Sequence, residues 1–302
     1  MSDVGRYHVQ QESWSAGAGP SRPSRYSNAL HGYLGAAGES APARPLERPV
    51  ATVTGTVLVG VDDSPASYMA VDHAAIEAEM HGWELRLLHV QHASGRQATH
   101  DANLQLLHTV TERVHAAAPA VAVTSHLATG SAASLLLIEG GNANLLVVGH
   151  RHSAMGTTLG LSVGDRVAAQ HAGVVMVVRM PYWPPGPGFG ALPLVVGVDN
   201  PASPTPAVTF ALHEARLRGC ELVMLHAQPN AASSERTETI DGVLVHHRTV
   251  DADPSPALID YSRQAAAVVV GRRGIGVNPV TMLGSVSRAM VQHANCPVFL
   301  AS

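Results

Sequence analysis

The sequence repeats itself, and this duplication constrains the fold more than any other feature. Val59-Gly60-Val61-Asp62 recurs 137 positions later as Val196-Gly197-Val198-Asp199. Further along, a shift of 122 positions carries Val147-Val148-Gly149 onto Val269-Val270-Gly271. The two shifts differ by 15 residues, which is about four turns of helix. The sequence therefore predicts one domain present twice, with a helix deleted between the second and fourth strands of the second copy.

Within the first copy, short apolar runs alternate with longer segments of helical character. The predicted strands are 57–61, 85–90, 121–127, 145–149 and 174–179, and the predicted helices are 66–81, 101–118, 131–140 and 163–171. Strict alternation of apolar strands and helices is typical of a parallel sheet covered on both faces. We therefore expect an α/β protein with two tandem doubly wound domains, each built on a five-stranded parallel sheet.

Composition sets the domain boundaries. Residues 1–53 lack a sustained apolar period and are predicted to be a disordered, solvated N-terminal tail. The first domain is predicted at 54–180 and the second at 192–302, joined by a linker at 181–191 that four prolines stiffen. In place of its second helix, the second domain has a short polar loop at 228–236. We expect the first domain or a partner chain to cover the sheet face left open there.

The bulk composition excludes several classes of protein. Charged residues make up 14% of the chain, aromatic residues 4%, and the net charge is −4, which argues against nucleic-acid binding. No apolar run is long enough to cross a bilayer, and the N-terminus lacks the design of a signal peptide. The two cysteines, Cys220 and Cys296, suit a reducing cytoplasm and are interpreted as small buried hydrophobic residues. The expected location is the cytoplasm.

A glycine-punctuated loop in the second copy carries the clearest chemistry. An apolar strand at 266–270 is followed by Gly271-Arg272-Arg273-Gly274, then nine residues, then Gly284-Ser285 and a helix. Glycines allow the backbone to approach an anion closely, and the N–H groups at a helix start supply donors and partial positive charge. The loop therefore predicts a phosphorylated ligand, most simply a nucleotide. Arg272 and Arg273 either neutralise phosphate charge or are solvated loop residues.

Gly-x2-Gly-x9-Gly-Ser after a buried strand, with an earlier strand ending Gly-Val-Asp, resembles the universal stress protein family. The resemblance covers 54–302 and implies an adenine-nucleotide-binding fold, ATP as ligand, pairing through the fifth strand, and a role in stress or growth arrest. Mg²⁺ could enter with the phosphates of the nucleotide. By this resemblance the nucleotide-binding residues are Asp199, Ala227, Gly271, Gly274, Gly284, Ser285, Val286 and Ser287.

The first copy departs from the family pattern. Gly149 matches Gly271, but an ungapped alignment places His152 opposite Gly274 and Ser162-Val163 opposite Gly284-Ser285. A side chain at the Gly274 position would collide with a closely approaching phosphate. We therefore expect a weakened or absent site in the first domain, with Asp62 and Gly149 as its candidates, and one working site in the second.

Catalytic and metal chemistry are not expected. The histidine pairs His150/His152 and His246/His247 have no acidic or cysteine cluster at metal-ligand spacing. Ser285 lacks a recognisable histidine–acid pair and is interpreted as a phosphate donor and helix cap. The loop contains no lysine and no evident water-positioning base, so rapid ATP hydrolysis is not expected, although slow turnover stays open.

Three functions therefore stay open. The first is an ATP-binding stress protein in which nucleotide occupancy of the second domain modulates contacts with an unknown protein partner. The second is a nucleotide-independent interaction module with a vestigial site, and the third is a slow ATPase. The fifth strands, 174–179 and 296–300, end each domain as apolar edges. Such edges predict either a homodimer or a pseudo-dimer within one chain.

Overall fold

The computed structural model describes residues 26, 28–30, 32–33, 55–91, 97–150, 162–179, 191–201, 203–272 and 283–302. Each strand and helix predicted in the first domain is present. These elements are β1 (Thr56–Val61), α2 (Pro65–His81), β2 (Glu84–Gln91), α3 (Gln97–Ala117), β3 (Val123–Thr129), α4 (Ala132–Gly140), β4 (Leu145–Gly149), α5 (Val163–Gln170) and β5 (Val175–Val178).

The second domain repeats this order with one substitution, a strand in place of α3. Its elements are β6 (Leu194–Gly197), α6 (Pro206–Arg218), β7 (Leu222–Ala227), β8 (Ser234–Ile240), β9 (Val243–Val250), α7 (Pro254–Tyr261), a short 3₁₀ helix η2 (Ser262–Gln264), β10 (Ala267–Gly271), α8 (Ser285–His293) and β11 (Val298–Ala301).

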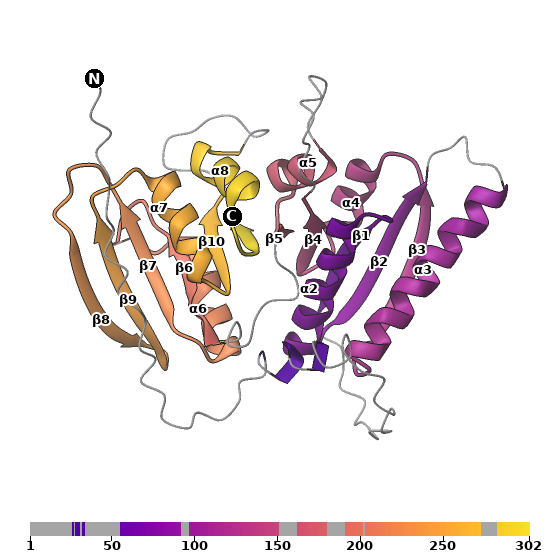
Figure 1. Cartoon of the computed structure of the whole chain (residues 1–302), viewed down its shortest axis with the longest axis horizontal. Coiled ribbons are helices and arrows are strands. Elements are labelled where there is room, and N and C mark those ends of the chain that lie inside the picture. Colours follow the sequence, from indigo (N-terminus) through magenta and orange to yellow (C-terminus); the bar gives the residue numbers. More distant parts are fainter. Residues whose placement is uncertain are drawn as a thin grey trace, which may run out of the picture.

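The two domains share a single sheet of 11 strands in the order β3-β2-β1-β4-β5-β11-β10-β6-β7-β9-β8 (Figure 1). Among the described strands, every pairing is parallel except β5–β11 and β8–β9. The β5–β11 pairing joins the domains, with Met176 opposite Phe299 at its centre. The fifth strands therefore pair within one chain, which is the pseudo-dimer alternative of the sequence prediction.

The sheet is covered on both faces because successive strand residues point to opposite sides. Val57 and Val59 belong to a core beneath α2, α3 and α6, whereas Leu58 belongs to a core beneath α4, α5, α7 and α8. The central strands are almost wholly buried, which explains why they appear in the sequence as continuous apolar runs.

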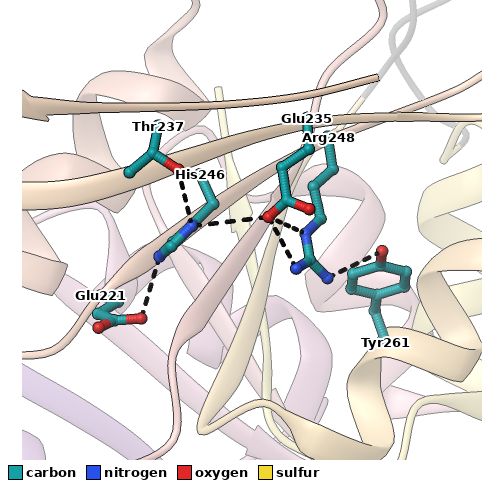
Figure 2. A network of polar contacts seen from close by, with 6 residues as sticks. All are labelled: Glu221, Glu235, Thr237, His246, Arg248 and Tyr261. Carbon is teal, nitrogen blue, oxygen red and sulfur yellow. Dashed lines mark hydrogen bonds and ion pairs between the residues drawn. The ribbon is translucent and has the colours of Figure 1, made fainter. Parts of the chain in front are cut away.

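Strand β8 was not predicted. The polar loop predicted at 228–236 is wrong from Ser234 onward, and the second domain has six strands rather than five. Polar side chains of β8 contact side chains of β9 across the hairpin (Figure 2). Glu235 lies opposite Arg248, with its Oε1 atom 2.8 Å from Nη2 of the arginine, and Thr237 lies opposite His246. Cross-strand pairs of this kind stabilise a hairpin, and charged side chains on an edge strand disfavour pairing with other chains.

The N-terminal tail prediction is also wrong for part of its length. Residues 26, 28–30 and 32–33 are helical, and Tyr26, Ala29, Leu30 and Tyr33 are 1–5% exposed within the core beneath α2 and α6. These four residues have the i, i+3, i+4, i+7 spacing of an amphipathic helix face. The stripe is only two turns long, so the surrounding polar composition concealed it.

Candidate functional site

A cavity of about 760 Å³ opens in the second domain at the carboxyl ends of β6, β7 and β10, next to the start of α8. Open parallel sheets collect ligands at this end, where the strand order reverses. Gly274 and Arg273 lie outside the described residues. The other residues that the sequence placed in the site all line this one cavity: Asp199, Ala227, Gly271, Gly284, Ser285, Val286 and Ser287.

The start of α8 presents main-chain donors to the cavity. Gly284 is the N-cap, so Ser285 is the first helical residue and its predicted role as helix cap is wrong. The first helical hydrogen bond runs from Arg288 N to Gly284 O at 2.9 Å. The N–H groups before it have no intrahelical acceptor, and glycine has no side chain to cap them. These groups are therefore suited to an anion.

The two ends of the glycine loop are tied together at the cavity. Gly284 N donates to Arg272 O at 3.0 Å, and the buried Ser287 Oγ donates to Gly271 O at 2.6 Å. The Ser287 hydroxyl thus fixes the helix start against the end of β10. Ser285 is exposed at the cavity, which leaves its hydroxyl accessible to a ligand.

Arg272 is 5% exposed and lines the cavity, so the alternative of a solvated loop arginine is wrong for it. Its Nη2 donates to the main-chain carbonyl oxygen of Gly173 in the first domain. Burial, followed by the positive charge of Arg272, lowers the pKa of the neighbouring His171. Sequence reasoning gave no signal for this contact between domains, because it arises only when β5 and β11 pair.

Asp199 is exposed at the cavity and does not cap α6, whose N-cap is Thr205 with Oγ1 3.3 Å from Val208 N. Ala227 is 9% exposed at the end of β7. The ring Nδ1 of the preceding His226 lies 3.0 Å from Val198 O, which holds the ends of β6 and β7 together. The main chain at 226–227 is thereby positioned beside the cavity.

The first domain has a cavity of about 830 Å³ in the equivalent place, lined by Asp62, Gly149, Ser162 and Val163 among others. Asp62 accepts hydrogen bonds from the main-chain nitrogen and the hydroxyl of Ser64, and Ser64 caps α2. A Cβ added at Gly149 would lie 2.4 Å from Ala66 O. Glycine is therefore required at this strand end by the packing of α2, whatever the cavity binds.

The structure keeps the ungapped alignment where the two helices start and departs from it afterwards. Ser162 is the N-cap of α5 and Gly284 is the N-cap of α8, a shift of 122. Within the first turn, Gly164 lies against Gly149 O and Ser287 against Gly271 O, a shift of 123, and β5 and β11 begin at Val175 and Val298 with the same shift. Helix α8 has 9 residues and α5 has 8, which accounts for the difference.

The two helix starts differ in charge. In the first domain Ser162 and Asp165 form a capping box, and Asp165 Oδ1 lies 3.4 Å from His150 Nε2. Hydrogen bonds from His150 and Ser162 lower the pKa of Asp165 to about 2, so it is anionic at neutral pH. The first turn of α8 contains no acidic residue. The second cavity is thus the better suited to an anion.

Other candidates for chemistry lie away from both cavities. His246 contacts Glu221 and Thr237, whereas His247 contacts Glu238, so the two rings face different partners; His152 lies outside the described residues. Burial raises the pKa of the Cys220 thiol to about 11 and also raises that of Cys296, which keeps both thiols protonated. Among the described residues, a different group converges: Glu77, His81 and Glu214, buried between α2 and α6.

Comparison with known proteins agrees with this geometry. The model of the universal stress protein family matches residues 54–179 and 230–302. Two universal stress proteins of Mycobacterium tuberculosis H37Rv are each 28% identical to this chain. One alignment spans 301 residues and covers 81% of this chain and 94% of the relative. The other spans 290 residues and covers 81% of this chain and 95% of the relative.

A crystal structure of a universal stress protein from Archaeoglobus fulgidus has a TM-score of 0.65 at 16% identity and covers 82% of this chain and 98% of its own. A putative universal stress protein from Pseudomonas aeruginosa has a TM-score of 0.54 at 12% identity, with 82% and 92% covered. None of the described helices is long and apolar enough to span a membrane. With a family model matching most of both domains, the chain belongs to the universal stress protein family.

Proposed function

We propose that this chain is a cytoplasmic stress-response protein that binds ATP in its second domain. The observation that carries the proposal is the convergence of Asp199, Ala227 and the described part of the glycine loop on one cavity. The cavity joins an acidic residue at the end of β6 to a set of main-chain donors at the start of α8. An adenosine group with a phosphate chain needs these two chemical environments side by side.

The triphosphate is assigned to the start of α8, and the ribose to the side of Asp199. Main-chain N–H groups and the Ser285 hydroxyl would donate to the phosphates, while Arg272 adds positive charge at the cavity. Mg²⁺ would enter with the phosphates rather than through a protein cage. The arrangement offers binding groups, and we assign no catalytic residue to it.

Nucleotide occupancy is proposed to change what the protein contacts, as expected of a protein acting in stress or growth arrest. A ligand shifts an equilibrium only through different affinities for the two states. Arg272 connects the two parts of the molecule, because it lines the cavity and also hydrogen-bonds to the first domain. Nucleotide binding that rearranges the glycine loop would therefore change the contact between the domains.

Titration of the purified full chain with a fluorescent ATP analogue tests the proposal. The informative pair is Ser285→Asp and Ser162→Asp, because these serines lie at the equivalent helix starts of the two domains and line the two cavities. Aspartate is favoured at a helix start. Ser162→Asp loses the hydrogen bond from the Ser162 hydroxyl to Asp165, so the circular dichroism and melting temperature of both variants are first compared with those of the parent. We expect Ser285→Asp to lose at least tenfold in affinity, since a carboxylate would face the phosphates, and Ser162→Asp to bind like the parent.

Equal affinity for the ATP analogue in all three proteins would contradict a binding site in the second domain. Loss in Ser162→Asp alone would move the site to the first domain. A parent protein that binds no nucleotide at all, yet still captures its protein partner, would favour the nucleotide-independent interaction module instead. A Gly274→Glu variant gives a second check of the same loop.

A further inference from the structure

The duplication places four ionisable residues face to face between the domains. Glu77 and His81 lie one turn apart on α2, and Glu214 and Arg218 occupy the equivalent positions of α6, 137 residues later. The side chains of Glu77, Glu214 and Arg218 are 1% exposed, and that of His81 is 7% exposed. We name these four residues the interdomain cluster. Its pseudo-twofold symmetry is broken at one position, where a histidine stands opposite an arginine.

Each cationic residue of the cluster contacts carboxylates from both helices. Arg218 Nη2 lies 2.5 Å from Glu77 Oε1, and its Nε lies 2.8 Å from Glu214 Oε1. His81 Nε2 lies 3.2 Å from Glu214 Oε2 and 3.9 Å from Glu77 Oε2. Arg218 therefore holds one oxygen of each carboxylate, and the ring of His81 faces the other.

The charges of the cluster balance only if it takes up a proton. Two carboxylates and the permanently charged Arg218 sum to −1, and a buried unbalanced charge is costly. The Oε2 atoms of Glu77 and Glu214 are buried and make no hydrogen bond within the described chain, apart from their approach to His81. One proton taken up by the cluster brings the sum to zero, and the Oε2 atoms and the His81 ring lie close enough to share it.

The surrounding groups do not supply the missing charge. The Tyr26 ring lies 4.2 Å from the guanidinium carbon of Arg218, and burial raises its pKa to about 12. Burial and then Arg218 lower the pKa of His73 to about 3, so this histidine is neutral. The Cys220 thiol stays protonated, as described above. Trp83 stacks on His81 with ring centroids 4.0 Å apart, and the exposed His213 ring lies 6.3 Å from His81.

We propose that the interdomain cluster is a proton-dependent clamp, in which the one proton that balances its charge locks α2 of the first domain to α6 of the second, and which weakens as the pH rises through neutrality. A divalent cation between the same atoms would leave the cluster with a charge of +1, because Arg218 stays charged. The proton leaves no net charge. The clamp adjoins the β5–β11 pairing, since Phe299 of β11 packs 5.7 Å from the Arg218 guanidinium.

The raised pKa of Glu77 predicts the same direction of pH dependence as the clamp. Burial raises the pKa of Glu77 to about 7, against the opposing effect of Arg218. Burial also acts to raise the pKa of Glu214, but Arg218 and His81 together lower it to about 2. A carboxyl group with a raised pKa contributes stability that is fully present below pH 4.5 and is lost as the pH rises through about 7.

Thermal unfolding of the full chain from pH 5.5 to 8.5, in EDTA at constant ionic strength, tests the clamp through Glu77→Gln. Glutamine keeps an acceptor for Arg218 and removes one negative charge, so Glu214 and Arg218 then balance without an added proton. We expect the melting temperature of the parent minus that of the variant to fall by about 3 °C or more across this range. His73 is present in both proteins, so its own pH dependence cancels.

The matched control is Glu139→Gln, which removes a carboxylate 3.1 Å from the exposed ring of His126. Its difference from the parent should stay flat, because exposed pairs contribute little. A flat difference for Glu77→Gln as well would overturn the clamp. Stabilisation of the parent by added Zn²⁺ that Glu77→Gln abolishes would overturn it in favour of a cation site.

Hydrogen exchange of the parent protein gives a readout that does not depend on a variant folding. After correction for the intrinsic pH dependence, amides of α2 and α6 should lose protection between pH 6 and pH 8 relative to those of α4, which lies on the opposite face of the sheet. An equal change in all three helices would also overturn the clamp.

Discussion

Arg272, at the carboxyl end of β10, donates a hydrogen bond to the main-chain carbonyl oxygen of Gly173, which precedes β5 in the other domain. The main-chain oxygen of the same arginine accepts from Gly284 N at the far end of the glycine loop. One residue thus connects the second-domain cavity, the start of α8 and the first domain. The antiparallel pairing of β5 with β11 brings these parts together, and a single isolated domain would lack the contact.

Replacement of Arg272 by glutamine should lower the free energy of unfolding by about 1.5–3 kcal/mol, because a charged donor to a buried carbonyl is lost. Urea unfolding of the full chain measures this change. The matched control is Arg263→Gln, since Arg263 is 65% exposed and lies 3.6 Å from the equally exposed Asp260. Its effect should stay within about 0.5 kcal/mol. Equal effects in the two variants would show that the Gly173 contact contributes nothing.

Phe299 is fully buried in β11 at the junction of the domains, with its ring 5.1 Å from that of Phe210. Phe299→Ala should lower the free energy of unfolding by about 3–5 kcal/mol, because it leaves a cavity where the two halves of the sheet meet. Phe299→Leu should cost clearly less, since it keeps most of the volume. Chemical denaturation of both variants measures the difference, and similar small losses would argue that the junction can collapse around the cavity.

Tyr26 tests the role of the N-terminal helix. It is 1% exposed and stacks on Arg218, so Tyr26→Ala should cost about 3 kcal/mol of stability from lost burial and cation–π contact. Asn28, which is exposed two residues away, provides the control. Differential scanning calorimetry of Tyr26→Ala and Asn28→Ala distinguishes the two situations. A solvated tail would give no loss for either variant.

The sequence predicted those parts of the fold in which local pattern and tertiary role agree. The strand at 145–149 is apolar throughout because it is buried on both faces, and its predicted bounds equal those of β4. The helix at 66–81 was recognisable because Ser64 and Pro65 begin it and Gly82 ends it, at a φ of +70°. The family resemblance, rather than local pattern alone, selected the seven described site residues that line one cavity.

The remaining features depend on tertiary context. Ser234–Ile240 forms a strand without apolar alternation, because β9 and cross-strand ion pairs stabilise it at the edge. Helix α8 is one residue longer than α5, which shifts β11 by one position, and an ungapped repeat could not show this. The sequence left Arg272 as either a phosphate-neutralising or a solvated residue and gave no sign that Glu77 is buried. Both are buried in the structure, where the two domains pair.

The capping box at the start of α5 provides a prediction with a defined pH window. The folded-state pKa of Asp165, about 2, is below its ordinary value of 3.8, so its contribution to stability is present above pH 3.8 and is lost as the pH falls toward 2. Asp165→Asn should therefore cost about 0.5–1 kcal/mol at pH 6 and progressively less below pH 4.

Thermal unfolding of the parent and Asp165→Asn at pH 6, 4 and 3 measures this convergence. Asp260→Asn on α7, where the carboxylate is 62% exposed, is the matched control and should show no such trend. A cost for Asp165→Asn that is the same at pH 3 as at pH 6 would mean that the shape of the side chain matters rather than its charge. In that case the negative charge at this helix start would not be what distinguishes the first cavity from the second.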